Sequence, residues 1–274
     1  MNALPLLGHA SLDDILAWRS SGPIRVREFL ADVDALAAQF PVGRNVLNVC
    51  QDRYRFTVGF AAGLVSGRTS LQPAAQSTET LRQVRAACPD VFCLCDGDFD
   101  SLDLPRLDFP ERVAVDPEKV VKIPEIRADQ VAACLFTSGS TGLPMPHQKT
   151  WGGLVRSGRA EAETLAMFVR SHTVVGTVPP QHSYGLESTV LLALHGNCPF
   201  WSGKPFYPQD IVAALDAVPR PRMLVTTPFH LSALLACDLD LPAVDLLLSA
   251  TAPQLVALGY KRGHQRAAPL REIF

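Results

Sequence analysis

The residues best suited to chemistry lie in the segment TSGSTGLPMPHQKTW, residues 137–151. Gly139 and Gly142 allow a tight turn with positive φ, so successive backbone N–H groups can converge on one anion. The hydroxyl donors of the segment are Thr137, Ser138, Ser140 and Thr141. Lys149 adds a mobile positive charge on a long side chain. These residue types at this spacing are expected to hold phosphate.

The flanking residues predict the elements that position this segment. The apolar run QVAACLF at 130–136 ends abruptly at the turn residues and predicts a buried strand. Apolar residues from Leu154 to Val169 recur at helical spacing and predict a helix over 151–169. Strand, glycine turn and helix together would form an anion cradle. The segment is not a Walker-type P-loop, which needs four residues between its glycines and then Gly-Lys-Ser/Thr. An ordinary Ser/Gly surface loop is the alternative.

Three segments resemble the motifs of adenylate-forming enzymes, the superfamily of acyl-CoA synthetases, aryl-CoA ligases and peptide-synthetase adenylation domains. TSGSTGLP is similar to the glycine-rich phosphate loop of that family. PPQHSYGLESTVLLALHGN at 179–197 resembles its second motif, a Pro and a His followed by a Gly that opens a helix near the acyl pocket. LLLSATAP at 246–253 resembles the strand and small-residue turn that the family places against adenine and the acyl group. The resemblance spans roughly residues 25 to 274 and is strong only at these motifs.

The resemblance implies ATP-dependent activation of a carboxylic acid. In the family, the carboxylate attacks the α-phosphate of ATP to give an acyl-adenylate and pyrophosphate, and a thiol of CoA or of a carrier protein then takes the acyl group. ATP and Mg²⁺ are the implied cofactors, and the implied class is an AMP-forming acid–thiol ligase. The His-containing second motif is similar to that of acyl- and aryl-CoA ligases, so an aryl or fatty acid is expected rather than an amino acid.

The resemblance also assigns site residues. The expected nucleotide contacts are Thr137, Ser138, Gly139, Ser140, Thr141, Gly142, Ala250, Thr251 and Ala252. The expected acid pocket consists of His182, Tyr184, Gly185 and Ser249. His182 would contact the acyl carboxylate or the pocket mouth; the alternative is a polar residue on an exposed turn. Gly185 would leave space for the ligand, because a helix packed close to a ligand has no room for a side chain.

The chain departs from the family directly after the phosphate loop. Where family members carry Lys after the loop's Pro, this chain has Met145, and the next cationic candidates are His147 and Lys149. Lys149 is favoured, because His147 with a reference pKa of about 6.5 would be mostly neutral at pH 7. Lys149 and His182 are therefore the catalytic candidates.

The second departure concerns the end of the sequence at Phe274. The family's Tyr-Gly-x-Thr-Glu segment, metal-binding Glu, ribose-binding Asp, hinge and C-terminal domain with its catalytic Lys would all lie beyond it, so no metal ligand is expected here. The expectation is a truncated N-terminal adenylating domain that makes little or no acyl-adenylate alone. Two alternatives stay open: a non-catalytic fragment or pseudoenzyme that binds a nucleotide or a partner, and an unrelated α/β nucleotide-binding fold that shares the loop by chance.

Composition excludes some classes of function. A formal charge of −2 gives no electrostatic footprint for nucleic acid or an anionic membrane. No apolar run approaches the ~18 residues of a membrane span, and no basic residue begins a signal peptide, so a cytoplasmic protein is expected. Seven cysteines suit that reducing compartment. Cys93 and Cys95, with Cys50 and Cys88, could suggest a metal site, but Cys-x-Cys within VFCLC predicts two side chains on one face of a buried strand.

The alternation of strand-like and helical runs predicts an α/β fold with parallel β-sheets flanked by helices. The predicted strands are 46–50, 91–95, 130–136, 173–178, 222–226 and 244–249. The predicted helices are 26–39, 53–66, 77–87, 151–169, 185–195, 208–217 and 229–236. We expect a division near residue 170 within the single domain 1–274, with the phosphate loop in 1–170 and the acyl- and adenine-side motifs in 171–274.

Overall fold

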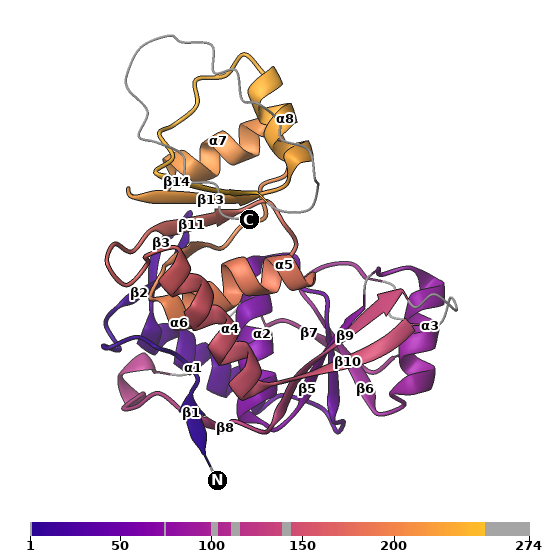
Figure 1. Cartoon of the computed structure of the whole chain (residues 1–274). Coiled ribbons are helices and arrows are strands. Elements are labelled where there is room, and N and C mark those ends of the chain that lie inside the picture. The colour runs from indigo at the N-terminus through magenta and orange to yellow at the C-terminus, as the bar shows by residue number, and fades with distance from the viewer. Residues whose placement is uncertain (1, 74, 100–103, 111–115, 139–143, 250–274) are drawn as a thin grey trace.

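The chain folds into two six-stranded sheets and a two-stranded ribbon in a computed structural model that describes residues 2–73, 75–99, 104–110, 116–138 and 144–249 (Figure 1). The first sheet has the order β10-β9-β5-β4-β6-β7, and its neighbouring strands are parallel except for β10 and β9. Its strands are β4 (Asn45–Asn48), β5 (Thr69–Pro73), β6 (Val91–Cys95), β7 (Arg106–Asp108), β9 (Val131–Ser138) and β10 (Pro144–Thr150). The expected α/β class with parallel sheets flanked by helices is confirmed.

The second sheet has the order β14-β13-β11-β12-β2-β3 and is parallel except for the β2–β3 hairpin. Its strands are β2 (Ile15–Arg19), β3 (Gly22–Arg25), β11 (Thr173–Gly176), β12 (Phe200–Trp201), β13 (Arg222–Thr226) and β14 (Leu246–Ser249). The short ribbon pairs β1 (Ala3–Pro5) with β8 (Glu125–Arg127). The division near residue 170 stays a prediction, and sheet membership departs from it where β2 and β3 join the second sheet.

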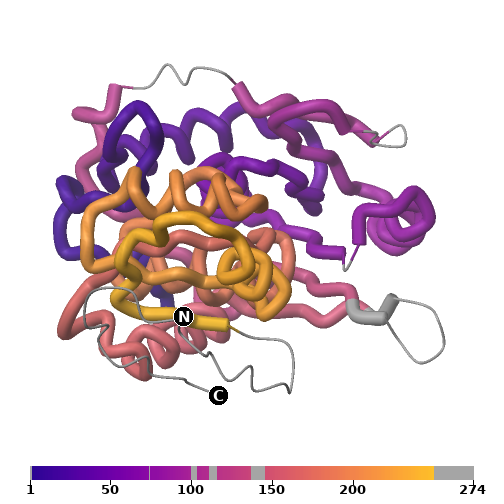
Figure 2. The backbone as a smooth tube through the Cα atoms, turned by 90° about the horizontal axis from the view of Figure 1, so that it is seen from above, coloured from indigo at the N-terminus to yellow at the C-terminus, as the bar shows by residue number. Residues whose placement is uncertain are grey.

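The helices form layers on both sides of each sheet (Figure 1 and Figure 2). The outer layers are α3 (Thr78–Ala87) on the first sheet, and α7 (Pro208–Asp216) with α8 (Pro228–Ala236) on the second. Between the sheets lie α1 (Val26–Ala37), α2 (Arg53–Val65), α4 (Trp151–Thr164) and a helical stretch of α5 (Ser183–Gly185), the π-helix η2 (Leu186–Leu191) and α6 (Leu192–Gly196). Because α2 has a sheet or a helix on every side, nearly all of its residues are buried.

Successive side chains of strand β6 face two different hydrophobic cores. Phe92 and Leu94 face the central core between the sheets, while Cys93 and Cys95 face the outer core beneath α3. The prediction that both cysteines share one face of a buried strand is confirmed. All seven cysteines are free thiols.

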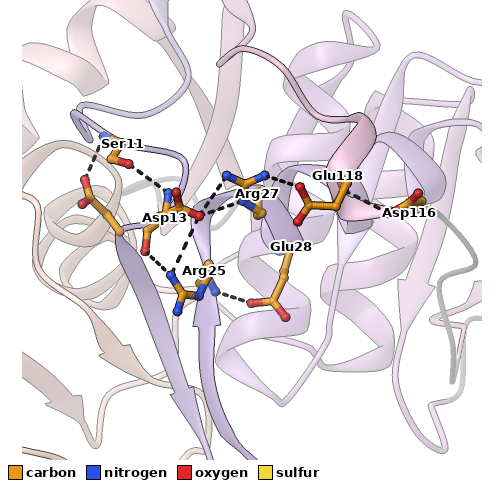
Figure 3. Close-up of polar contacts among 8 residues, drawn as sticks. Ser11, Asp13, Arg25, Arg27, Glu28, Asp116 and Glu118 are labelled. Carbon is orange, nitrogen blue, oxygen red and sulfur yellow. Dashed lines mark hydrogen bonds and ion pairs between the residues drawn. The ribbon is translucent and has the colours of Figure 1, made fainter.

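A polar network fastens the N-terminal segment to the central layer (Figure 3). The Asp13 carboxylate accepts a hydrogen bond from Arg27 Nε at 2.9 Å, and Arg27 Nη1 also donates to Glu118 at 3.1 Å. Glu118 belongs to the short 3₁₀ helix η1 (Pro117–Lys119). At the start of α1, the Glu28 carboxylate accepts from the Arg25 backbone N–H at 2.6 Å. These contacts hold two separate segments, around Asp13 and Glu118, against the N-terminus of α1.

Each predicted strand and helix is present, but two helices differ from their predicted form. The helix predicted over 151–169 ends at Thr164, and Ala166 adopts a left-handed conformation with φ of 57°. The helix predicted over 185–195 has a π-helical interior, η2. No helix in the described part of the chain is both long and apolar enough to cross a membrane.

Candidate functional site

The predicted phosphate loop joins two antiparallel strands. Residues 139–143 lie outside the described part of the chain, so Gly139, Ser140, Thr141 and Gly142 stay predictions. Thr137 and Ser138 end β9 and pair with Met145 and Pro144 at the start of β10. The expected strand–turn–helix cradle is wrong, because β10 intervenes and α4 begins only at Trp151. The N-terminus of α4 instead lies at the other end of β9, where Trp151 N–H donates to Gln130 O at 2.8 Å.

The strand β10 also places the candidate cations. Met145, His147 and Lys149 occupy alternate positions along it, at register positions opposite Thr137, Leu135 and Ala133 of β9. Lys149 therefore lies about 13 Å beyond Met145, at roughly 3.3 Å per residue. Its side chain is exposed, as is that of His147. The role of Lys149 stays a prediction.

The second motif lies at the carboxyl edge of the second sheet. It follows β11, which ends at Gly176, and between the two the Thr177 N–H continues the pairing by donating to Val225 O at 2.9 Å. The carboxyl ends of β11, β12, β13 and β14 meet at this edge, because these strands are parallel. Ligands of open α/β sheets bind at such edges.

Tyr184 joins the second motif to the third. Its hydroxyl lies 3.1 Å from the carbonyl oxygens of Thr226 and Leu248, at the ends of β13 and β14. Ser249 is exposed at the end of β14, opposite Thr226 in the parallel register. Ala250, Thr251 and Ala252 lie outside the described residues. The structure therefore brings Tyr184 and Ser249 to one edge.

Gly185 is required for a different reason from the predicted one. A Cβ at this position would overlap the carbonyl oxygen of Pro179, in the loop that leads into α5. The expectation that Gly185 makes room for a ligand is thus corrected in its physical reason, because backbone fills that space. Gly185 lets the loop fold tightly over the start of its own helix.

His182 precedes α5 and is exposed. Its backbone carbonyl accepts from Leu186 N–H at 2.8 Å. Partial burial of the ring lowers the pKa of His182, and the positive charge of Lys204 lowers it further. Lys204 follows β12, donates to Gln51 Oε1 at 2.9 Å, and lines an open groove of about 440 Å³ beside α7.

A histidine–hydroxyl chain at the same edge was not predicted. His230 Nδ1 lies 2.8 Å from Thr177 Oγ1, which lies 2.9 Å from Thr226 Oγ1. Burial lowers the pKa of His230, and its ring packs edge-to-face with the rings of Phe206 and Phe229 at centroid distances of 5.1 and 5.7 Å. The sequence signal was Thr227-Pro228, a helix cap and first-turn proline that place His230 in the first turn of α8.

Arg53 is the other unpredicted residue. Its side chain is fully buried at the start of α2 and donates to three oxygens around the second motif. These acceptors are Thr189 Oγ1 at 2.7 Å, Gly176 O at 2.8 Å and Val178 O at 2.9 Å. Desolvation lowers the pKa of Arg53 to about 10, although Asp52 nearby raises it. An arginine at the start of a helix is usually exposed to solvent, so the sequence around Arg53 gives no indication that the residue is buried and holds these three oxygens.

Metal ligation has no candidate among the residues that the structure describes, where no group of three or more His, Cys, Asp or Glu is placed to hold an ion. Because Mg²⁺ beside a nucleotide usually takes only one or two carboxylates together with substrate phosphates and waters, such a cluster is not required to hold it.

Comparisons with known proteins agree with this geometry. The sequence model described as AMP-binding enzyme matches residues 44–262. The 4-coumarate–CoA ligase 2 of Nicotiana tabacum is 32% identical over 139 residues, which cover 47% of this chain and 25% of that enzyme. The chain thus aligns with only about a quarter of the length of that curated relative.

Solved structures show the same fold. A double mutant of o-succinylbenzoate CoA synthetase (MenE) from Bacillus subtilis, bound to the product analogue OSB-NCoA, superposes with a TM-score of 0.73 at 16% identity and covers 90% of this chain and 54% of that one. The same enzyme in complex with ATP and magnesium ion gives a TM-score of 0.69 at 16% identity, covering 90% of this chain and 70% of that one.

Proposed function

This chain belongs to the AMP-binding enzyme family, and we propose that it contributes the nucleotide- and acid-binding part of an acid–thiol ligase. The reaction is ATP-dependent conversion of a carboxylic acid to an acyl-adenylate, followed by transfer to the thiol of CoA or of a carrier protein. One observation carries the proposal: Tyr184 hydrogen-bonds at the ends of both β13 and β14, so that the acid-side and adenine-side motifs meet at one sheet edge.

Different residues would bind the phosphates and the acid. Backbone N–H and hydroxyl groups of residues 137–142 would hold the phosphates, and Lys149 would supply the mobile cation. His182 is mainly neutral at pH 7 because its pKa is lowered, so its ring N–H can donate to a carboxylate oxygen. Mg²⁺, when bound, would neutralise phosphate charge, and phosphate oxygens would supply part of its coordination, because the described residues contain no cluster of three or more ligand side chains.

The acid is proposed to be aryl or fatty. The rings of Phe206, Phe229 and His230 line the sheet edge next to Thr177 and offer aromatic surface rather than a partner for an α-amino group. Relatives such as the tobacco 4-coumarate–CoA ligase act on an aryl acid.

The seven free thiols support a cytoplasmic location.

The test is calorimetric binding to the 274-residue chain, with AMP compared against a sulfamoyl analogue of 4-coumaroyl-adenylate. We expect the analogue to bind on the order of 10²-fold more tightly than AMP, because mimics of the reaction centre engage both halves of the site. Tyr184→Phe should reduce that preference, while Tyr207→Phe, at an exposed tyrosine directly before α7, should not.

Equal affinity for AMP and the analogue would favour the alternative function, a non-catalytic nucleotide-binding protein. Failure to bind AMP, ATP and the analogue would contradict the proposal altogether.

A further inference from the structure

Arg53 connects the two sheets at the acid side of the site. It is the first residue of α2, the helix that follows β4 of the first sheet, yet its guanidinium donates to Gly176 O and Val178 O at the end of β11 in the second sheet. These carbonyls flank Thr177, where the loop that carries His182 and Tyr184 begins. One side chain from the first sheet thus holds the start of that loop.

The same guanidinium reaches the far end of the loop through a hydroxyl relay. Arg53 Nη1 donates to Thr189 Oγ1 at 2.7 Å, and the Thr189 hydroxyl in turn donates to Gly185 O. Gly185 is the last residue of α5, and Thr189 lies within the π-helix η2. Arg53 therefore fixes the segment from both ends, at 176–178 and at 185–189, and π-helical turns often occur at functional sites.

Neighbouring backbone contacts strengthen this clamp. The Arg53 N–H donates to Ser202 O at 2.6 Å, and Gln181 Nε2, within the loop, donates to Cys50 O at 2.6 Å. A Cβ on Gly176 would come within 2.9 Å of Arg53 Nη2, so the strand end is shaped to admit the guanidinium.

Fold stability alone is a weak explanation for this residue. Arg53 forms no ion pair within the described part of the chain, and its Nε is buried without a hydrogen-bond partner. A buried charge without a paired carboxylate costs several kcal/mol in desolvation, and an apolar side chain of similar volume would avoid that cost. What an apolar side chain cannot do is hold three oxygen acceptors in fixed positions.

We propose that Arg53 is a positioning residue that sets the shape of the loop 177–185 and thereby the affinity of the site for the acyl part of its ligand. That the ligand carries an acyl group rests on the proposed function. The contacts by which Arg53 holds the loop rest on hydrogen-bond geometry alone. It makes the acid site of the second sheet dependent on a helix anchored in the first.

The first experiment measures loop shape by hydrogen exchange and mass spectrometry of peptides spanning 176–190. Arg53→Met removes every side-chain donor, Thr189→Val removes only the relay, and Arg55→Met makes the same chemical change on the same helix at a side chain that stacks on Phe109 instead. We expect roughly tenfold faster exchange in this segment for Arg53→Met, a smaller increase for Thr189→Val, and no change for Arg55→Met. Wild-type exchange in both Arg53→Met and Thr189→Val would overturn the proposal.

The second experiment measures affinity for AMP and for the 4-coumaroyl-adenylate analogue in the same variants. Arg53→Met should weaken binding of the analogue on the order of tenfold and that of AMP by less than about twofold. Arg53→Lys keeps the charge but cannot reach all three acceptors, so it should recover only part of the loss. Full recovery by Arg53→Lys would contradict a geometric clamp and indicate a purely electrostatic role.

Together the two experiments distinguish a failure of the positioning role of Arg53 from a failure of the proposed function. Faster loop exchange with unchanged analogue affinity would overturn the positioning role in acid binding. If the wild-type chain does not distinguish the analogue from AMP, the proposed function fails, and exchange alone decides whether Arg53 shapes the loop. If Arg53→Met does not fold, Thr189→Val and Arg53→Lys carry both measurements.

Discussion

Two buried histidines should make the fold acid-sensitive. His9 is 7% exposed and His195, in α6, is 1% exposed, and among the described residues neither ring has a hydrogen-bond partner for either nitrogen. Burial lowers the pKa of His9 to about 4, opposed by Asp14, and lowers that of His195 to about 3, assisted by the charges of Arg159 and His9. Protonating either ring would therefore place an unsolvated charge in the core.

The sign follows from the direction of these shifts. Because both pKa values are lower in the folded than in the unfolded chain, the unfolded chain binds more protons below about pH 6.5, and stability falls as pH falls. From pH 7.5 to pH 5, each histidine should remove about 2 kcal/mol from the free energy of unfolding, about 4 kcal/mol together. That loss is comparable to a large part of the total stability of a domain, about 5–15 kcal/mol.

Urea unfolding followed by circular dichroism at both pH values tests this prediction. Burial raises the pKa of Asp32 and Glu161, and these carboxyls act in the opposite direction, so the comparison must be between variants. In His9→Leu/His195→Leu the loss between pH 7.5 and pH 5 should shrink by about 4 kcal/mol. The control His147→Leu changes an exposed histidine on β10 and should leave the loss unchanged. Equal losses in the double variant and wild type would refute the reasoning.

Three further predictions concern the site. Gly185→Ala should lower the free energy of unfolding by on the order of 3 kcal/mol, measured by thermal unfolding, because the new Cβ would overlap Pro179 O. The control Gly63→Ala in α2, where the nearest atom to the new Cβ is 3.9 Å away, should be neutral or stabilising. A neutral Gly185→Ala would contradict the tight loop. Gly139→Val should abolish ATP binding in calorimetry while the variant stays folded, and unchanged affinity would exclude the loop as the phosphate site. Lys149→Ala should weaken ATP binding more than His147→Ala does, and the opposite order would show that Lys149 is not the phosphate partner.

Elements with a strong local pattern could be predicted from the sequence. VFCLC in β6 is apolar on both faces because helices cover both faces of a parallel sheet, and it becomes a strand with every residue buried. The strand β10 was missed because Pro144 and Pro146 weaken a strand pattern. Prolines are tolerated there because β10 is an edge strand, and its polar residues 147–150 are exposed, as edge strands require.

The β2–β3 hairpin was missed for a different reason. Its residues 15–25 precede the first sheet in the chain but pair with β12, which begins at Phe200. No local pattern encodes a partner so distant in sequence. The predicted division near residue 170 assumed that neighbouring segments share a sheet, and this hairpin does not follow that assumption.

The same reasoning separates the predictable from the unpredictable part of the site. Tyr184, Gly185 and Ser249 could be selected because each lies within a contiguous motif. Arg53 could not, because its three acceptors lie more than a hundred residues away in sequence. A motif identifies the residues that meet a ligand, but the side chain that holds the motif in shape can come from any element packed beneath it. Once the fold is known, a fully buried arginine with carbonyl partners and no ion pair among the described residues is the signal that identifies such a residue, because burial of that charge requires a specific compensating geometry.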